Sequence, residues 1–143
     1  MPRISFFQED INYNLKNKLK VKQWIKDTIA AEGYQLDELT YIFCSDNYLL
    51  KINQQYLDHD TYTDIITFDN SSEKGIITGD IFISIERIRE NAAKFNQSVT
   101  DELHRVIIHG ALHLLGYKDK TAVDSKNMTQ MEDKYLDKRG FNS

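Results

Sequence analysis

The pattern of hydrophobic and polar positions along the chain predicts an ordered series of strands and helices. Short apolar or β-branched runs that favour strands cover residues 4–7, 39–44, 63–68 and 76–85. Apolar residues recur at helical spacing over residues 14–32, 46–57, 86–96, 103–115 and 122–139. This order predicts a single α+β domain over residues 1–143, in which a small mixed four-stranded sheet is packed with about five helices.

Local signals predict where several of these elements begin. Ser45 and Ser84 are candidate N-caps for the helices that start at residues 46 and 86, and Ser98 or Thr100 can cap the helix that contains residues 103–115. The polar segment 70–75 is too short for a crossover, so the two strands that flank it are expected to form an antiparallel hairpin.

The helix at residues 103–115 carries the most informative motif. His109 and His113 are four residues apart, so their rings lie on one helix face, one turn apart, and can aim at a single metal ion. Gly116 can end the helix in a left-handed conformation, after which Asp119 can supply a carboxylate as the third ligand. Three protein ligands leave a coordination position open, as in catalytic sites.

The alternative is that the two histidines are ordinary packing residues. The helix is apolar almost all round, which predicts that it is the central buried helix of the domain. A buried imidazole needs polar partners, whether these are a metal ion or neighbouring side chains. A pair of histidines four apart is a weak motif by itself, but Gly116 and Asp119 at suitable spacing favour the metal site.

Composition and charge narrow the class of protein. The chain is 41% hydrophobic and 28% charged, which is typical of a soluble globular domain. No apolar run approaches the roughly 20 residues that span a membrane, and the N-terminus lacks the apolar stretch of a signal peptide. Cys44 is the single cysteine, so an internal disulfide and a cysteine-based zinc site are excluded. We therefore expect a cytoplasmic protein without a membrane partner.

The net charge of −4 argues against a broadly basic nucleic-acid-binding protein, although a local basic face remains compatible with it. Five lysines lie close together in the first predicted helix, and we interpret them as a solvated face rather than an RNA contact: Lys16, Lys18, Lys20, Lys22 and Lys26.

Three motifs together resemble the YbeY family, bacterial metal-dependent endoribonucleases of ribosomal RNA maturation. The family pattern H-G-x-L-H-L-x-G-Y-D-H is matched by H-G-A-L-H-L-L-G-Y-K-D at residues 109–119. The stretch T-D-V-L-S-F is matched by T-D-I-I-T-F at residues 63–68, and G-D-I stands at residues 79–81. The similarity extends over about residues 53–136, and the fold that it implies agrees with the element order above.

The resemblance implies a function and a set of partners. The activity would be a single-strand-type endoribonuclease that hydrolyses phosphodiesters with metal assistance in ribosome biogenesis, with ribosomal RNA and the small ribosomal subunit as partners. His109, His113 and Asp119 would hold one Zn²⁺ ion, and other divalent transition metals are possible. Asp64 and Asp80 lie in the other two motifs and are candidates for supporting or pocket roles, with an ion pair or a helix cap as the alternative for each.

The chain departs from the family pattern at two positions. Asp119 stands where the family usually has a third histidine, which makes the site less positive by one charge and more permissive toward iron or manganese. Leu57 stands where the family has an arginine connected with RNA cleavage. We hypothesise that His59 or Lys118 supplies a positive group for catalysis instead.

Two other functions remain as alternatives. Zinc proteases of the H-E-x-x-H type carry a glutamate as general base where this chain has Gly110, so peptide hydrolysis would lack its base. A metal-stabilised ribosome-assembly factor without catalysis would agree with the acidic net charge and with Leu57, because RNA affinity normally depends on clustered basic side chains.

Overall fold

The structure, a computed structural model, describes residues 2–57 and 62–141 and confirms the predicted α+β fold. The strands are β1 (Arg3–Gln8), β2 (Gln35–Cys44), β3 (Ile65–Asp69) and β4 (Ile76–Ser84). The helices are α1 (Lys18–Ala31), α2 (Asp46–Leu57), α3 (Ile85–Lys94), α4 (Val99–Leu114) and α5 (Ala122–Asp137). None of the helices in the described ranges combines the length and the apolar character that a bilayer crossing requires.

The four strands form one mixed sheet in the order β1-β2-β4-β3. β2 pairs in parallel with both β1 and β4, whereas β3 and β4 pair antiparallel, as the short connection at residues 70–75 predicts. β3 therefore lies at an edge of the sheet. Successive side chains of a strand point to opposite faces, so alternate residues of β3 face the helices that pack on that side.

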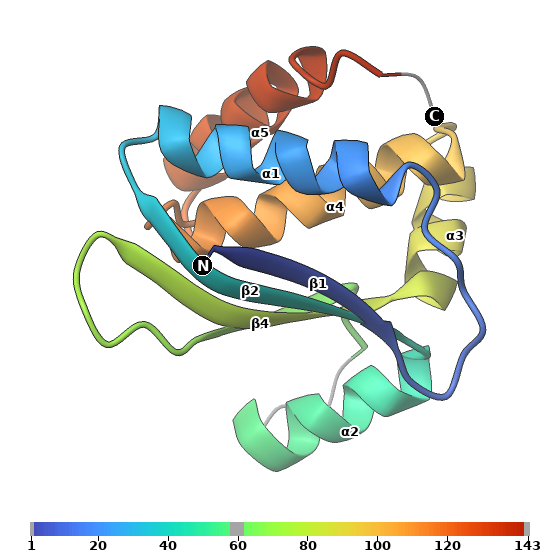
Figure 1. Ribbon diagram of the computed structural model, residues 1–143. Coiled ribbons are helices and arrows are strands. Elements are labelled where there is room, and N and C mark those ends of the chain that lie inside the picture. Colours follow the sequence, from blue (N-terminus) through green and yellow to red (C-terminus); the bar gives the residue numbers. More distant parts are fainter. Residues whose placement is uncertain (1, 58–61, 142–143) are drawn as a thin grey trace.

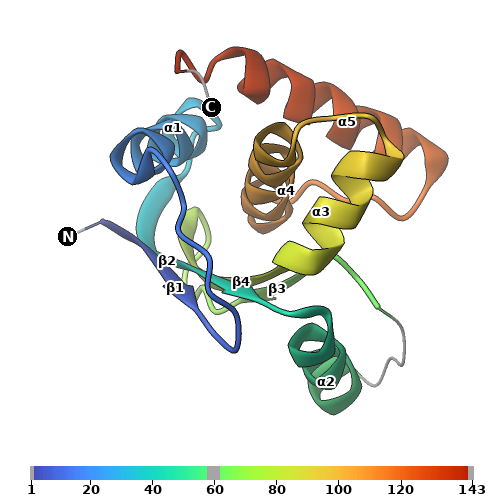
Figure 2. The ribbon, with the colours of Figure 1, turned by 90° about the vertical axis from the view of Figure 1, so that its right-hand side faces the viewer.

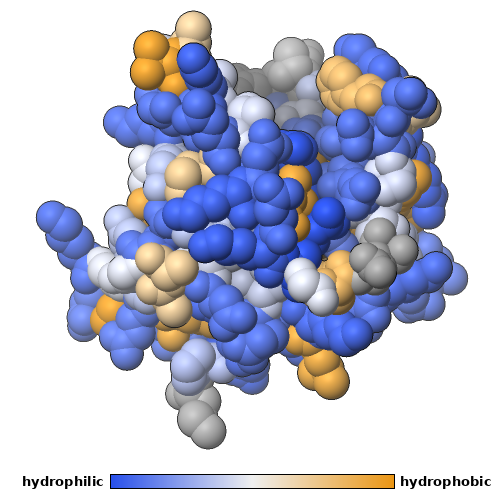
Figure 3. Space-filling model, turned by 90° about the horizontal axis from the view of Figure 1, so that it is seen from above, coloured by the Kyte–Doolittle hydropathy of each residue, from blue (hydrophilic) through white to orange (hydrophobic). Residues whose placement is uncertain are grey.

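The helices cover the two faces of the sheet unequally. α1, α3, α4 and α5 lie on one face, and α2 lies alone on the other (Figures 1 and 2). The larger hydrophobic core fills the space between the sheet and the four-helix layer. A smaller core lies beneath α2 and contains Cys44, Leu49, Ile52 and Ile66. Viewed from outside, the helical layer is mostly hydrophilic, with apolar side chains in separate small patches (Figure 3).

α4 is the central helix of this layer, and Gly110 lets it approach the sheet closely. A Cβ atom at position 110 would lie only 2.9 Å from Ile65 Cδ1 and 3.0 Å from Ile81 Cδ1. Ile107 and Leu112 of the same helix are fully buried. The face of α4 that carries Gly110 thus packs on β3 and β4.

The predicted N-caps explain where three helices begin. Ser45, Ser84 and Ser98 each accept a hydrogen bond from the backbone N–H three residues further on. Ser98, not Thr100, is therefore the cap of α4, and this helix begins at residue 99.

The first helix starts later than its apolar pattern predicts. α1 begins at Lys18 rather than at residue 14, because Asn17 adopts a left-handed conformation with a φ of 58°. Leu15 is buried, but it packs from the segment before the helix. The hydrophobic pattern therefore identified a buried position without identifying its backbone conformation.

Candidate metal centre

The structure brings the side chains of His109, His113 and Asp119 together at the end of α4. Asp119 Oδ2 lies 3.4 Å from His109 Nε2 and 3.3 Å from His113 Nε2. One ligand atom from each residue lies within 4.8 Å of those of the other two. Two imidazole nitrogens and a carboxylate oxygen at this separation can hold one divalent ion between them.

A turn at Gly116 brings Asp119 back toward the helix. Gly116 has a φ of +102°, a left-handed conformation that a side chain would disfavour. Its N–H donates to the His113 carbonyl at 3.0 Å, and the Tyr117 N–H donates to the Leu112 carbonyl at 3.1 Å. These bonds end the helix and reverse the chain, so the carboxylate three residues later faces the two rings.

Each histidine ring is oriented by an acceptor at its Nδ1 atom. His109 Nδ1 lies 2.6 Å from Glu132 Oε2, and His113 Nδ1 lies 3.0 Å from the Tyr117 carbonyl oxygen. An ionised carboxylate and a carbonyl can only accept, so Nδ1 carries the hydrogen in both rings. The Nε2 lone pairs are therefore free and point toward Asp119, which is the arrangement that a metal ion requires.

Glu132 of α5 is buried and belongs to a charged network. Its Oε1 atom accepts from Arg105 Nη1 at 2.7 Å, and Arg105 Nη2 donates to Asp133 Oδ1 at 2.6 Å. Burial by itself would lower the pKa of His109, but the hydrogen bond and charge of Glu132 outweigh it and raise that pKa. The network thus fixes the orientation of the His109 ring and increases the basicity of His109 as a metal ligand.

The loop that carries Asp119 is tied to α1. The Tyr117 hydroxyl donates to Glu32 Oε1 at 2.6 Å, and the Tyr135 hydroxyl donates to the other oxygen of Glu32. The bond to Glu32, together with burial, raises the pKa of Tyr117 to about 12, so the hydroxyl stays protonated and remains a donor. Glu32 therefore holds the residue whose carbonyl orients His113.

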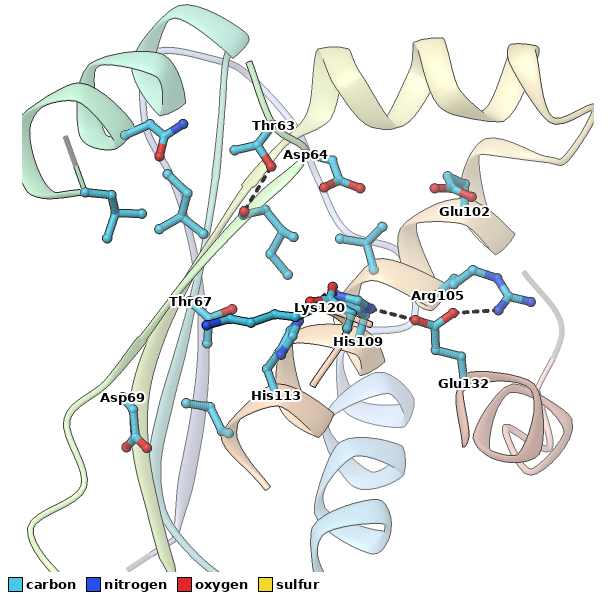
Figure 4. Close-up of a pocket in the computed structure, with 17 residues that line it drawn as sticks. Thr63, Asp64, Thr67, Asp69, Glu102, Arg105, His109, His113, Lys120 and Glu132 are labelled. Atoms are coloured by element: carbon cyan, nitrogen blue, oxygen red, sulfur yellow. Dashed lines mark hydrogen bonds and ion pairs between the residues drawn. The ribbon is translucent and has the colours of Figure 1, made fainter. Parts of the chain in front are cut away.

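A cavity of about 980 Å³ opens beside the three ligands (Figure 4). Ile65, Thr67 and Asp69, alternate residues of the edge strand β3, form one wall. The opposite wall contains Arg105 of α4 and Glu132 of α5. The candidate metal centre therefore lies in an open pocket and is accessible to a large substrate.

The two candidate aspartates of the other motifs lie in different places. Asp64 lines the pocket, and burial raises the pKa of its carboxyl group although the charge of His109 opposes this shift. Asp80 does not reach the pocket: its Oδ2 accepts a hydrogen bond from Asn70 Nδ2 at 3.1 Å. Asp80 shares a face of β4 with Phe82, which packs in the smaller core beneath α2, so it points away from the metal centre.

The two candidate positive groups, Lys118 and His59, are not placed at the pocket among the described residues. Lys118 is exposed and does not line the pocket, whereas Lys120 does. His59, the other candidate, lies outside the described residues. Leu57, at the position of the family's arginine, lines the pocket with an apolar side chain.

Glu132 and Arg105 were not singled out by the sequence, although a signal for Glu132 exists. In α5 it lies between Met128 and Tyr135 at helical spacing, and both of these residues are buried. An acidic residue on the apolar face of a helix needs a partner, which predicts a functional or paired role. Nothing comparable marks Arg105.

Comparisons with known proteins show the family of the chain. Residues 3–140 match the family described as "Endoribonuclease YbeY". Relatives with that name are 53% identical in Cytophaga hutchinsonii, over 96% of each chain, and 48% identical in Flavobacterium psychrophilum, over 91% of this chain and 92% of the relative. The solution structure of a Thermotoga maritima protein is similar with a TM-score of 0.67 and 28% identity, over 96% of this chain and 89% of that one.

Proposed function

The chain belongs to the YbeY family of endoribonucleases, and from this we propose that it hydrolyses single-stranded RNA at the pocket beside His109, His113 and Asp119. The observation that carries the proposal is the convergence of these three side chains, with both Nδ1 atoms already bonded to acceptors. We further propose that its role is the maturation of ribosomal RNA in the small ribosomal subunit, in the cytoplasm.

We propose Zn²⁺ as the resident ion, because two imidazoles and one carboxylate form a ligand set that zinc accepts. The same set accepts other divalent transition metals, with availability deciding between them. When bound, the ion supplies Lewis-acid chemistry for phosphodiester hydrolysis.

The residues of the chain contribute orientation and proton handling. Glu132 and the Tyr117 carbonyl hold the two rings by their Nδ1 atoms, so that Nε2 of each would be available to a bound ion. Asp64 lines the same pocket, and burial raises the pKa of its carboxyl group above the usual value, which favours a role in holding or moving a proton. We propose this role for Asp64 in the hydrolytic step.

A direct test uses wild type and His113→Ala with a structured ribosomal RNA fragment and, separately, an unstructured protein. We expect metal-dependent RNA cleavage by wild type, loss of cleavage with a chelator, and no cleavage by the variant. Cleavage of the protein would instead indicate a protease, and specific RNA or ribosome binding without any cleavage would indicate an assembly factor.

The packing around Gly110 argues against the protease alternative. The general base of H-E-x-x-H proteases would stand there, but this side of α4 packs against Ile65 and Ile81 of the sheet. A glutamate at this position would enter the core rather than the pocket.

A further inference from the structure

The pocket beside the metal centre is lined by more acidic than basic side chains. Its carboxylates include Asp64, Asp69 and Glu102 in addition to Asp119 and Glu132. The backbone of RNA carries one negative charge per phosphate, so an incoming strand is repelled unless cations compensate. A metal ion held by the three ligands would be one such cation. A second cation beside it would favour binding of the phosphate further.

Among the described residues that line the pocket, Arg105 and Lys120 carry a permanent positive charge. The guanidinium of Arg105 is already occupied by Glu132 at 2.7 Å and Asp133 at 2.6 Å. Releasing it to bind a phosphate would leave the buried carboxylate of Glu132 with its hydrogen bond to His109 but without the guanidinium that compensates its charge, which is costly. Arg105 is therefore a structural partner of Glu132 rather than a ligand for RNA.

Lys120 is differently placed. It directly follows the ligand Asp119, it is exposed, and within the part of the chain that the structure describes it makes no hydrogen bond or ion pair. Figure 4 shows its side chain extended across the pocket in the direction of Thr67. An ammonium group in this position offers three donors to a phosphate without first breaking an existing contact.

We propose that Lys120 binds a non-bridging oxygen of the scissile phosphate, with the metal centre on the neighbouring side of the same group. This inference rests on the proposed function, since it names the residue that would position its substrate. Because Lys120 belongs to the same loop as Asp119, the turn at Gly116 places the ligand and the phosphate-binding cation together. Lys120 would thus have the role of positive group for catalysis that the sequence suggested for Lys118.

The test compares Lys120→Gln with Lys126→Gln, which removes the same charge from an exposed lysine of α5 outside the pocket. Affinity of metal-free protein for a single-stranded RNA oligonucleotide is measured over a range of salt concentrations. Loss of one phosphate contact is expected to reduce the slope of log affinity against log salt by about 0.7 in Lys120→Gln, with no change in Lys126→Gln. A merely structural role of Lys120 would not change this slope.

Cleavage is measured in parallel with metal-loaded protein. We expect kcat/KM to fall about tenfold to a hundredfold in Lys120→Gln and to recover largely in Lys120→Arg. Metal content by elemental analysis should equal that of wild type, which shows that the ligand set is intact. Equal salt slopes and equal kcat/KM in the two glutamine variants would overturn the role of Lys120 while the proposed function stands. Failure of wild type to cleave RNA would overturn the proposed function, and the binding slopes would still decide the role of Lys120.

Discussion

At the scale of single residues, the chemistry of the site depends on which nitrogen of each imidazole carries the hydrogen. Glu132 and the Tyr117 carbonyl each accept from Nδ1, and this choice leaves Nε2 of His109 and His113 available as ligands. Without these acceptors either tautomer would be accessible, and binding a metal ion would have to select one. Glu132 and the Tyr117 carbonyl therefore hold both imidazoles in the tautomer that binds a metal ion, even when no ion is bound.

Glu132→Gln tests whether this control of the His109 ring contributes to metal affinity. The neutral amide accepts more weakly from His109 and no longer compensates the charge of Arg105, so metal affinity is expected to fall about 10- to 100-fold. The measurement is competition with a chelating dye. Asp133→Asn is the matched control, because it removes the other carboxylate of Arg105 without touching His109. Equal losses in the two variants would show that net charge, and not the orientation of His109, sets the affinity.

Among the residues that the structure describes, His104 is the buried histidine outside the metal centre, and its environment keeps it neutral. Burial, followed by the charge of Arg139, lowers its pKa to about 4. Arg139 Nη1 lies 2.9 Å from His104 Nδ1, so this nitrogen must accept, and a proton there would face the guanidinium. The ring packs against Trp24 and Phe141, with centroids 5.7 and 5.6 Å away. His104 is therefore a packing residue.

This environment makes stability depend on pH. The unfolded chain binds a proton at His104 near pH 6.5, whereas the folded chain does so only near pH 4. The stabilisation is thus complete above the unfolded pKa and is lost as the pH falls toward the folded pKa. Between about pH 7 and about pH 5 we expect a loss of about 2 kcal/mol in the free energy of unfolding from this residue.

Urea unfolding of wild type and His104→Gln, in the presence of a chelator, measures this contribution. Glutamine keeps an acceptor but does not titrate, so the stability difference between the two proteins should shrink as the pH falls. A difference that stays constant with pH would contradict the assignment of a neutral His104.

At the scale of elements, two glycines set how closely α4, β3 and β4 approach one another. A Cβ atom at Gly79 of β4 would lie 2.7 Å from the Phe68 carbonyl oxygen and 3.0 Å from Leu114 Cδ1. At Gly110 of α4 the nearest atoms belong to side chains of Ile65 and Ile81. The pocket is built on this contact, because β3 supplies one wall and α4 supplies the histidines.

We expect Gly79→Ala to destabilise the protein by about 2–3 kcal/mol, because a backbone oxygen in a paired strand is unable to move aside. Gly110→Ala should cost less, since isoleucine side chains can adjust and alanine gains about 1 kcal/mol in helix propensity over glycine. Chemical denaturation of both variants measures the difference. A larger loss in Gly110→Ala would show that the α4 contact is the more rigid of the two.

At the scale of the whole molecule, the metal centre joins segments that lie far apart in the sequence. The ligands come from α4 and the loop after it, Glu132 from α5, and Glu32, which holds Tyr117, from the residue after α1. Binding of an ion would therefore stabilise the packing of the helical layer as a unit. The folded state alone presents the three ligands together, so metal binding is linked to stability.

Metal at about 100 times its dissociation constant should add about 2.7 kcal/mol to the free energy of unfolding, which raises the melting temperature by about 8 °C in a domain of this size. Differential scanning fluorimetry with Zn²⁺ measures the shift, and a chelator should reverse it. Mg²⁺ is the control ion, because it prefers oxygen ligands and should have little effect. His113→Ala should show no shift with Zn²⁺; a shift equal to that of wild type would place the stabilising ion elsewhere.

The sequence by itself determined the features that depend on short-range geometry. Hydrophobic periodicity determined the order of strands and helices, and the short turn determined the antiparallel pairing of β3 and β4. The spacing of His109 and His113 on one helix, with Gly116 after it, likewise determined that the rings and Asp119 can converge. Each of these follows from helix pitch, strand pleat or a glycine bend, which act over a few residues.

Only the tertiary structure decided the rest of the site. Asp80 and Phe82 share one face of β4 by alternation, but the face on which the metal centre lies depends on how α4 packs on the sheet. Lys120 lines the pocket and Lys118 does not, and the loop that carries both is held by the hydrogen bond between Tyr117 and Glu32, which are 85 residues apart in the chain. Contacts between distant segments depend on the packing of whole elements, and no local pattern of residues specifies that packing.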